Sequence, residues 1–240
     1  MQQFAIHEIN VAKGSPNISF LKFINSKDIS LIASDAITKE LYVYNQSMQP
    51  INSIKTDFTT VDMIQRGNGS YLATDIGILS PNDNSVGRIY NFQSNSFLKK
   101  ETFNFDLIMK GLKRPVFTKE VDLNNDGRLD LLIGQFGNTN GELAWFELMP
   151  NNTYEKHVLH ATPGSINAKL LDLNHDGLMD IVTLFAQGDE SIRYYQNKGK
   201  GQFSETVLLQ FPPIYGSSSF DMVDMNHDGL LDIVYTCGDN

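Results

Sequence analysis

Three short acidic segments contain the residues of this chain whose types and spacing could do chemistry. Each reads D-x-N-x-D-G-x-x-D, beginning at Asp122, Asp172 and Asp224. Side-chain oxygens at positions 1, 3, 5 and 9, with a backbone carbonyl at position 7, form a ligand set that suits Ca²⁺, and glycine at position 6 permits the sharp left-handed turn around an ion. Mg²⁺ is disfavoured because it requires a smaller octahedral shell. The sequence therefore predicts three calcium sites.

Five residues in each loop are the predicted ligands. They are Asp122, Asn124, Asp126, Arg128 (through its carbonyl) and Asp130 in the first loop; Asp172, Asn174, Asp176, Leu178 (carbonyl) and Asp180 in the second; and Asp224, Asn226, Asp228, Leu230 (carbonyl) and Asp232 in the third. Nine of the 19 Asp residues lie in these loops, and this concentration of like charge would be neutralised by cations. The alternative, acidic turns without metal, is disfavoured by the presence of three intact copies. No Cys or His cluster offers a zinc or copper site.

The acidic loops lie inside a longer repeat that predicts the surrounding elements. The segments VDLNNDGRLDLLIG, LDLNHDGLMDIVTL and VDMNHDGLLDIVYT begin at Val121, Leu171 and Val223, which are 50 and 52 residues apart. Alternating segments such as ELAWFEL and SIRYYQN follow them, and YEKHVL and FSETVL come next. Short β-branched and aromatic runs bounded by Asp-Gly indicate strands. About four strands per repeat of this length are typical of a propeller blade, with a stacked solenoid as the alternative.

Two degraded copies of the unit precede the intact ones. In these copies Lys22 and Asp62 align with Asp122, while Ser30 and Ser70 replace the last ligand, so we expect no metal there. The fold is expected to be all-β, a β-propeller of four-stranded antiparallel blades. Its units should lie near residues 18–58, 59–105, 115–159, 165–209 and 217–240, with an N-terminal strand at 3–9. Because the fifth unit stops after its second strand, we expect an incomplete propeller or a fragment of one.

These units resemble FG-GAP/VCBS repeats, the blades of integrin-type propellers and of many bacterial surface and secreted proteins. The resemblance is strong from Val121 onward and weak before it. It implies that the acidic loop joins the first two strands of a blade and binds calcium in a structural role. An EF-hand is disfavoured because Ile133, Thr183 and Tyr235 stand where that motif needs Glu, and because a strand follows the loop.

The remaining candidate residues have simpler interpretations. Paired aromatic residues recur at one position of the unit and are expected to pack in the core rather than to bind sugars; they are Tyr42/Tyr44, Tyr90/Phe92, Trp145/Phe146 and Tyr194/Tyr195. His175 and His227 should point to solvent. His7, His157 and His160 have no evident catalytic partners. Cys237, the only cysteine, is expected to be a buried thiol at a strand end, and it excludes an internal disulfide.

The composition and loops favour a binding role. A net charge of −9 excludes broad attraction to nucleic acid or anionic membranes, and no apolar run could span a bilayer. We expect a non-enzymatic binding or scaffold module for a protein or glycan partner, either a monomer or a domain of a larger exported chain (extracellular, periplasmic or at the cell surface), although no signal peptide is visible. The partner would meet polar, glycine-containing loops at 80–87, 136–141, 185–191 and 211–219. The alternatives are a lectin or carbohydrate-active enzyme and, third, a calcium-dependent phosphatase.

Overall fold

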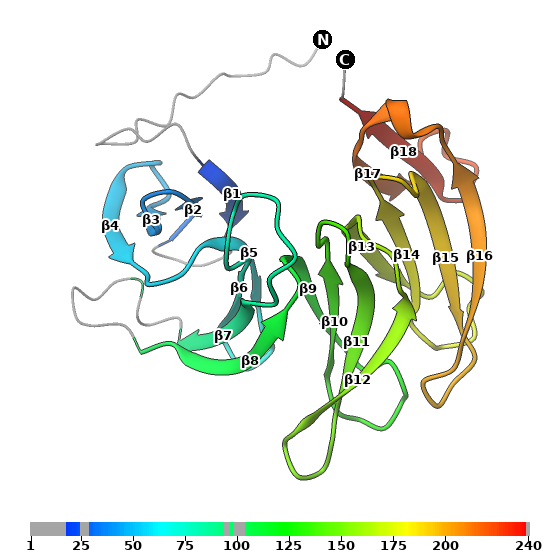
Figure 1. Cartoon of the computed structure of the whole chain (residues 1–240), viewed down its shortest axis with the longest axis horizontal. Coiled ribbons are helices and arrows are strands. Elements are labelled where there is room, and N and C mark those ends of the chain that lie inside the picture. Colours follow the sequence, from blue (N-terminus) through cyan, green and yellow to red (C-terminus); the bar gives the residue numbers. More distant parts are fainter. Residues whose placement is uncertain (1–17, 25–28, 94–96, 98–103, 239–240) are drawn as a thin grey trace. The chain divides into compact units, whose positions relative to one another are not determined.

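The computed structural model describes residues 18–24, 29–93, 97 and 104–238. In these ranges the chain is all-β, with four antiparallel four-stranded sheets and one two-stranded sheet (Figure 1). Each four-stranded sheet is a simple meander, because consecutive strands of the sequence are hydrogen-bonded neighbours. Each meander has the topology expected of a blade. The predicted N-terminal strand at 3–9, with His7, lies outside the described residues.

The strand bounds follow the sequence repeat. The first sheet contains β1 (Ile18–Phe23), β2 (Leu31–Asp35), β3 (Glu40–Tyr44) and β4 (Pro50–Lys55). The second contains β5 (Thr60–Gln65), β6 (Ser70–Asp75), β7 (Gly87–Gln93) and β8 (Asp106–Leu112). The third contains β9 (Pro115–Val121), β10 (Asp130–Gln135), β11 (Glu142–Leu148) and β12 (Tyr154–His160). The fourth contains β13 (Ser165–Leu171), β14 (Asp180–Phe185), β15 (Ser191–Asn197) and β16 (Phe203–Gln210). A 3-10 turn, η2 (Pro213–Tyr215), leads to the hairpin of β17 (Ser217–Val223) and β18 (Asp232–Cys237).

The chain divides into two compact units. One comprises residues 1–75 and 89–108, and the other comprises residues 76–88 and 109–240. The first unit holds β1–β4 and most of β5–β8, and the second holds the remaining sheets. The core of the first unit is rich in aromatic rings. Tyr71 stacks on Phe92 with centroids 5.6 Å apart, and Phe97 meets Tyr71 edge-on at 5.1 Å.

In the second unit, the inner strands of the sheets are the most buried. All residues of β10 and β14 are buried, whereas β16 at a sheet edge is almost wholly exposed. This gradient explains why LDLLIG and DIVTLF are nearly continuous apolar runs rather than alternating ones. Gly134 in β10 is required by close packing, because a Cβ there would come within 2.0 Å of the Phe117 ring.

The aromatic pairs pack in the cores, as the sequence predicts. Tyr44, Phe92, Trp145, Phe146 and Tyr195 are buried. Their partners Tyr42, Tyr90 and Tyr194 are partly buried. Trp145 is only 2% exposed, which removes the one tryptophan as a surface platform for sugars.

The prediction for Cys237 is wrong. Its side chain is exposed, although it lies at the end of strand β18 as expected. Strand β18 pairs only with β17 among the described strands, so its residues lack the cover that a third strand gives to β10 and β14.

Candidate metal centres

Each of the three acidic loops is closed by an equivalent pair of strand residues. The residue before each loop pairs with the ninth loop residue: Val121 with Asp130, Leu171 with Asp180, and Val223 with Asp232. Each loop therefore joins the first two strands of its sheet, as the family resemblance implies. The first eight loop residues form the connection, and the ninth begins the second strand.

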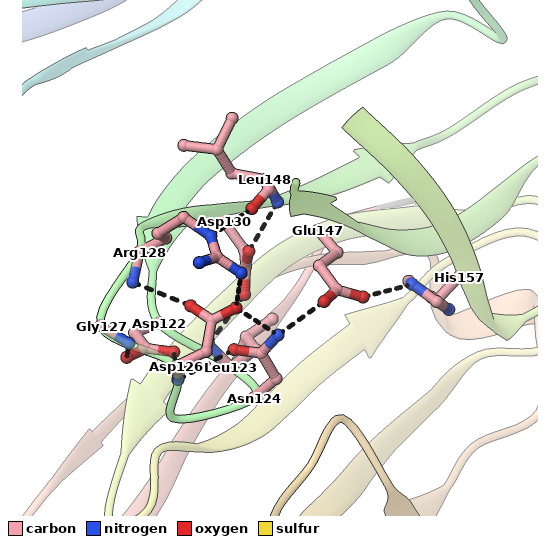
Figure 2. A network of polar contacts seen from close by, with 10 residues as sticks. All are labelled: Asp122, Leu123, Asn124, Asp126, Gly127, Arg128, Asp130, Glu147, Leu148 and His157. Atoms are coloured by element: carbon pink, nitrogen blue, oxygen red, sulfur yellow. Dashed lines mark hydrogen bonds and ion pairs between the residues drawn. The ribbon is translucent and has the colours of Figure 1, made fainter. Parts of the chain in front are cut away.

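Asp122 organises the first loop by accepting hydrogen bonds from its backbone (Figure 2). Its Oδ2 accepts from the N–H of Gly127 at 2.8 Å, and its Oδ1 accepts from the N–H of Asp126 at 3.2 Å. Asn124 Oδ1 also accepts from that Asp126 N–H, at 3.1 Å. Asp126 Oδ1 accepts from the N–H of Arg128 at 2.9 Å. The side chains at positions 1, 3 and 5 thus fold inward onto the loop.

The second and third loops repeat this pattern closely. The N–H of position 6 donates to the carboxylate of position 1 at 2.8 Å in the second loop and 2.9 Å in the third. The N–H of position 5 donates to position 1 at 3.1 Å in both, and to the asparagine at 3.0 and 2.9 Å. Because the residues at the variable positions differ, the D-x-N-x-D-G residues themselves determine the loop conformation.

Two positions of each loop adopt left-handed backbone conformations. The glycines at position 6 have φ of 85°, 85° and 88°, as the sequence predicts. Position 4 is also left-handed, with φ of 61° at Asn125, 59° at His175 and 62° at His227. Such φ values are uncommon outside glycine, although Asn and His are among the residues that tolerate them best. His175 and His227 are exposed, which confirms that they point to solvent.

The carboxylate at position 9 of the first loop is fully buried. Asp130 Oδ1 accepts from the N–H of Leu148 at 2.8 Å, and Oδ2 accepts from the N–H of Leu123 at 3.1 Å. Burial raises the pKa of Asp130, and the charges of Asp126 and Asp122 add to this rise against the two backbone hydrogen bonds. A cation beside these groups would favour the charged form.

Asp180 occupies the same place in the second loop and is also buried. Its Oδ1 accepts from the N–H of Asn197 at 2.8 Å, and its Oδ2 accepts from the Tyr194 hydroxyl at 2.8 Å. Burial and this hydrogen bond raise the pKa of Tyr194 well above its usual range. Asp232 of the third loop is only half-buried, and its Oδ2 accepts from the N–H of Met225 at 2.9 Å.

The donors of each loop fit a hard cation. Three carboxylates, one amide oxygen and one backbone carbonyl supply only oxygen, which suits Ca²⁺. In the ranges that the structure describes, no three His, Cys, Asp or Glu side chains are gathered so that they could hold a metal ion on their own. A calcium shell would therefore depend on the Asn and backbone oxygens as well, and binding at the fifteen ligand positions stays a prediction.

In the second sheet, a short turn connects the first two strands, where the third and fourth sheets have an acidic loop. Strand β5 ends at Gln65 and β6 begins at Ser70, so four residues replace the eight of the acidic connections. Asn68 Oδ1 accepts hydrogen bonds from the N–H and the Oγ of Ser70 at 2.9 and 2.7 Å. This turn is closed by neutral hydrogen bonds within the protein.

The alignment of Lys22 and Asp62 with Asp122 is wrong. Lys22 lies inside β1 and Asp62 inside β5, whereas Asp122 follows the end of β9. The degraded copies differ from the intact units in the length of the connection as well as in its acidic residues. An alignment without gaps therefore places strand residues against a loop residue.

A stack of side chains beside the first loop was not expected from the sequence. The His157 ring lies 4.4 Å from the Trp145 ring, centroid to centroid, at an interplanar angle of 20°. His157 Nε2 contacts Glu147 Oε2 at 3.0 Å, and Glu147 Oε1 accepts from the Asn124 amide at 2.8 Å. These groups and Asp126 line a cavity of about 420 Å³. His157 therefore has partners, contrary to expectation, because β11 and β12 pair Trp145 with His157.

A second polar cluster joins β12, β15 and β16. Arg193 contacts Asp189 at 2.8 Å and Glu205 at 2.5 Å, and His160 Nδ1 lies 3.2 Å from Glu205. Burial and the nearby Arg193 charge lower the pKa of His160. Ser191 donates to Asp189 rather than to His160, so these residues do not form a nucleophile and base pair.

Comparison with known families identifies the repeats. A model described as FG-GAP-like repeat matches residues 122–183 and 172–235. No curated protein matches the sequence. Nor is any helix in the described ranges long and apolar enough to cross a membrane.

Solved structures resemble the fold at low sequence identity. A luciferin-regenerating enzyme is 14% identical with a TM-score of 0.56, and the match covers 90% of this chain and 75% of that one. A Bacteroides fragilis protein described as exported is 10% identical with a TM-score of 0.39, covering 87% of this chain and 64% of that one. The first likeness concerns the fold alone and is consistent with a propeller-like arrangement of the sheets. The acidic loops, their closing strand pairs and the family match together identify residues 122–235 as FG-GAP-like repeats.

Proposed function

We propose that this chain is a calcium-stabilised, propeller-type module that binds a protein or glycan partner without catalysing a reaction. One observation carries the proposal: three loops with different variable residues share one hydrogen-bonded conformation and one oxygen-only donor set. The three aspartates of each loop contribute a formal charge of −3. Like charges held this close destabilise a fold unless a cation offsets them. Burial is the main cause of the raised pKa of Asp130, and the charges of Asp126 and Asp122 add to it.

The ion would hold the first two strands of a sheet together. Each loop begins directly after one strand, and its ninth residue is the first residue of the next. An ion held by positions 1, 3, 5, 7 and 9 would therefore stabilise the hairpin that starts each sheet. Every predicted ligand comes from the protein itself, which favours a structural ion over a catalytic one, since catalytic metals keep an open position.

Loops of the second unit offer a fixed surface for a partner. The Arg114 guanidinium donates to the carbonyl of Gly137 at 2.5 Å and to the carbonyl of Leu79 at 3.0 Å. Asp83 accepts from the N–H and the hydroxyl of Thr139 at 2.8 and 2.7 Å. These hydrogen bonds thus hold the segment around 79–83 and the loop at 136–141 together. A loop fixed before binding loses less entropy when a partner docks, which supports a binding role.

The alternative functions have less support in the site. A lectin or carbohydrate-active enzyme would use several exposed aromatic rings, but Trp145 and Tyr195 are buried, and Tyr215 is the one exposed Phe, Tyr or Trp ring among the described residues. A phosphatase would use several unpaired basic residues around the metal; beside the first loop, Arg128 is paired with Asp126, and Lys200 lines the adjacent cavity. The activity in the name of the luciferin-regenerating enzyme is not carried over at 14% identity. We also propose an extracellular, periplasmic or cell-surface location, where calcium is abundant.

Thermal unfolding of the purified chain in calcium, in magnesium and in chelator tests the calcium sites. We expect a calcium-specific rise in melting temperature, because an ion that binds only the folded state at 100 times its Kd adds about 2.7 kcal/mol per site. Replacing the first aspartate of all three loops with Asn should abolish the rise. Identical melts in all three conditions would contradict the proposal. With calcium present, glycan and protein binding screens would then identify the partner.

A further inference from the structure

Arg128 distinguishes the first acidic loop from the other two. Position 7 is Leu178 in the second loop and Leu230 in the third. In the first loop, Arg128 Nη2 forms an ion pair with Asp126 Oδ2, and its Nε donates to the carbonyl of Leu148 at 2.7 Å (Figure 2). The arginine therefore connects position 5 of the loop to the end of strand β11.

The ion pair engages an oxygen that a calcium ion would need. Asp126 Oδ1 accepts from the backbone of Arg128, while Oδ2 accepts both from the Asn124 amide at 3.0 Å and from the guanidinium. In the second loop, Asp176 Oδ2 accepts from the Asn174 amide at 2.8 Å, and no ion pair to Asp176 occurs among the described residues. The first loop alone thus combines its predicted ligands with a cation from the chain.

We propose, resting on the calcium sites of the proposed function, that Arg128 is an internal counter-ion that makes the first loop the weakest of the three calcium sites. Its guanidinium lowers the formal charge of that loop from −3 to −2. Calcium affinity in loops of this kind is tuned by ligand charge and rigidity. An incoming ion must also share Asp126 with the guanidinium or displace it.

Glu147 does not cancel this effect. It is the other acidic neighbour of the first loop, but its carboxylate contacts the Asn124 amide at 2.8 Å and His157 at 3.0 Å. Arg128, by contrast, contacts a predicted ligand oxygen directly. The ion pair is partly exposed, with side-chain exposures of 37% for Arg128 and 24% for Asp126, so the effect on affinity should be moderate.

The inference predicts a stepwise response to calcium. The second and third loops fill first, while Arg128 holds the first loop closed without an ion. At higher calcium the first loop fills and the guanidinium leaves Asp126. Because the same side chain bonds the Leu148 carbonyl, this last step loosens the contact between the loop and the end of β11.

Calcium titration calorimetry on the full chain tests the order of filling. We expect two tight sites and one weak site in the wild type. Arg128→Leu, which installs the residue of the other loops, should tighten the weak site about ten-fold, equivalent to about 1.4 kcal/mol. Leu178→Arg is the matched reverse change, and it should leave one tight site and two weak ones. Melting in chelator checks that both variants fold.

Terbium luminescence assigns the weak site to the first loop. Trp145, the only tryptophan, lines the same cavity as Asn124 and Asp126, so excitation selective for tryptophan should sensitise Tb³⁺ bound there. Asp122→Asn should remove that signal. Three sites of equal affinity in the wild type, or an unchanged weak site in Arg128→Leu, would overturn the role of Arg128 and leave the calcium sites standing. Absence of binding in every variant would instead overturn the proposed function, and this inference with it.

Discussion

The second sheet and the fourth sheet show two ways of closing the same strand unit. In β5–β8 the first connection is four residues long, and Asn68 closes it through hydrogen bonds to Ser70. In β13–β16 the first connection is eight residues long. It carries Asp172 and Asp176, and Asp180 begins the strand that follows it. The first arrangement needs nothing beyond the protein. The second concentrates three carboxylates, whose like charge a bound cation would offset.

The cores around these two sheets both contain aromatic rings. The rings of Tyr71, Phe92 and Phe97 form a continuous aromatic cluster beside the short turn. Beside the acidic loop, the core of the fourth sheet combines aliphatic side chains of β14 with the rings of Phe185 and Tyr195. Stability in the second sheet should come from packing and hydrogen bonds within the protein, whereas in the fourth it should depend partly on a bound ion. Three substitutions test this contrast.

Phe92→Ala should have the largest effect. Phe92 is 1% exposed and meets both Tyr71 and Phe97, and truncation of such a ring costs about 3–5 kcal/mol. The loss should be equal in calcium and in chelator. Urea unfolding, with hydrogen exchange of β5–β7 as a local probe, measures it, and Phe92→Leu serves as the milder control. A loss that depends on calcium would break the contrast between the sheets.

Asp176→Asn should remove most of the stabilisation that calcium gives through the second loop. The expected loss is about 2–3 kcal/mol in saturating calcium, from one ion site. In chelator the change should stay within about 0.5 kcal/mol, because Asp176 is exposed. Melting temperatures in the two conditions provide the comparison. Asp221→Asn, an exposed aspartate outside the loops, is the control and should lose no calcium response. Equal losses for Asp176→Asn in both conditions would argue against an ion at this loop.

Asn68→Ala should have the smallest effect of the three. It removes the acceptor for the N–H and hydroxyl of Ser70, and net losses for such hydrogen bonds are about 1 kcal/mol. Chemical unfolding with and without calcium should give the same value. Asn68→Asp keeps the acceptor and should retain most of the stability. A melting temperature of the Ala variant that rises with calcium would contradict this contrast, because it would mean that the turn, like the acidic loops, depends on an ion.

Local features of the molecule could be predicted from the sequence because their causes lie within a few residues. The acidic loops adopt a single conformation set by Asp, Asn and Gly at fixed positions, and strands such as β11 and β15 begin where the repeat places them. The degraded units were misaligned, because their connections are shorter: Asp62, aligned with the loop residue Asp122, lies inside β5. Gaps of this kind are invisible without the strand pairing.

Contacts between segments far apart in sequence required the tertiary structure. The stacking of His157 on Trp145, the ion pairs of Arg193 and the fastening of two loops by Arg114 depend on strand register and loop path. The exposure of Cys237 depends on whether a further strand covers β18. By itself, the sequence determined the repeat, the acidic loops and their oxygen donors, because these follow from short-range backbone preferences. Only the tertiary structure decided that the first loop differs from the others, because the bond from Arg128 to the Leu148 carbonyl spans 20 residues and forms only once β11 is in place.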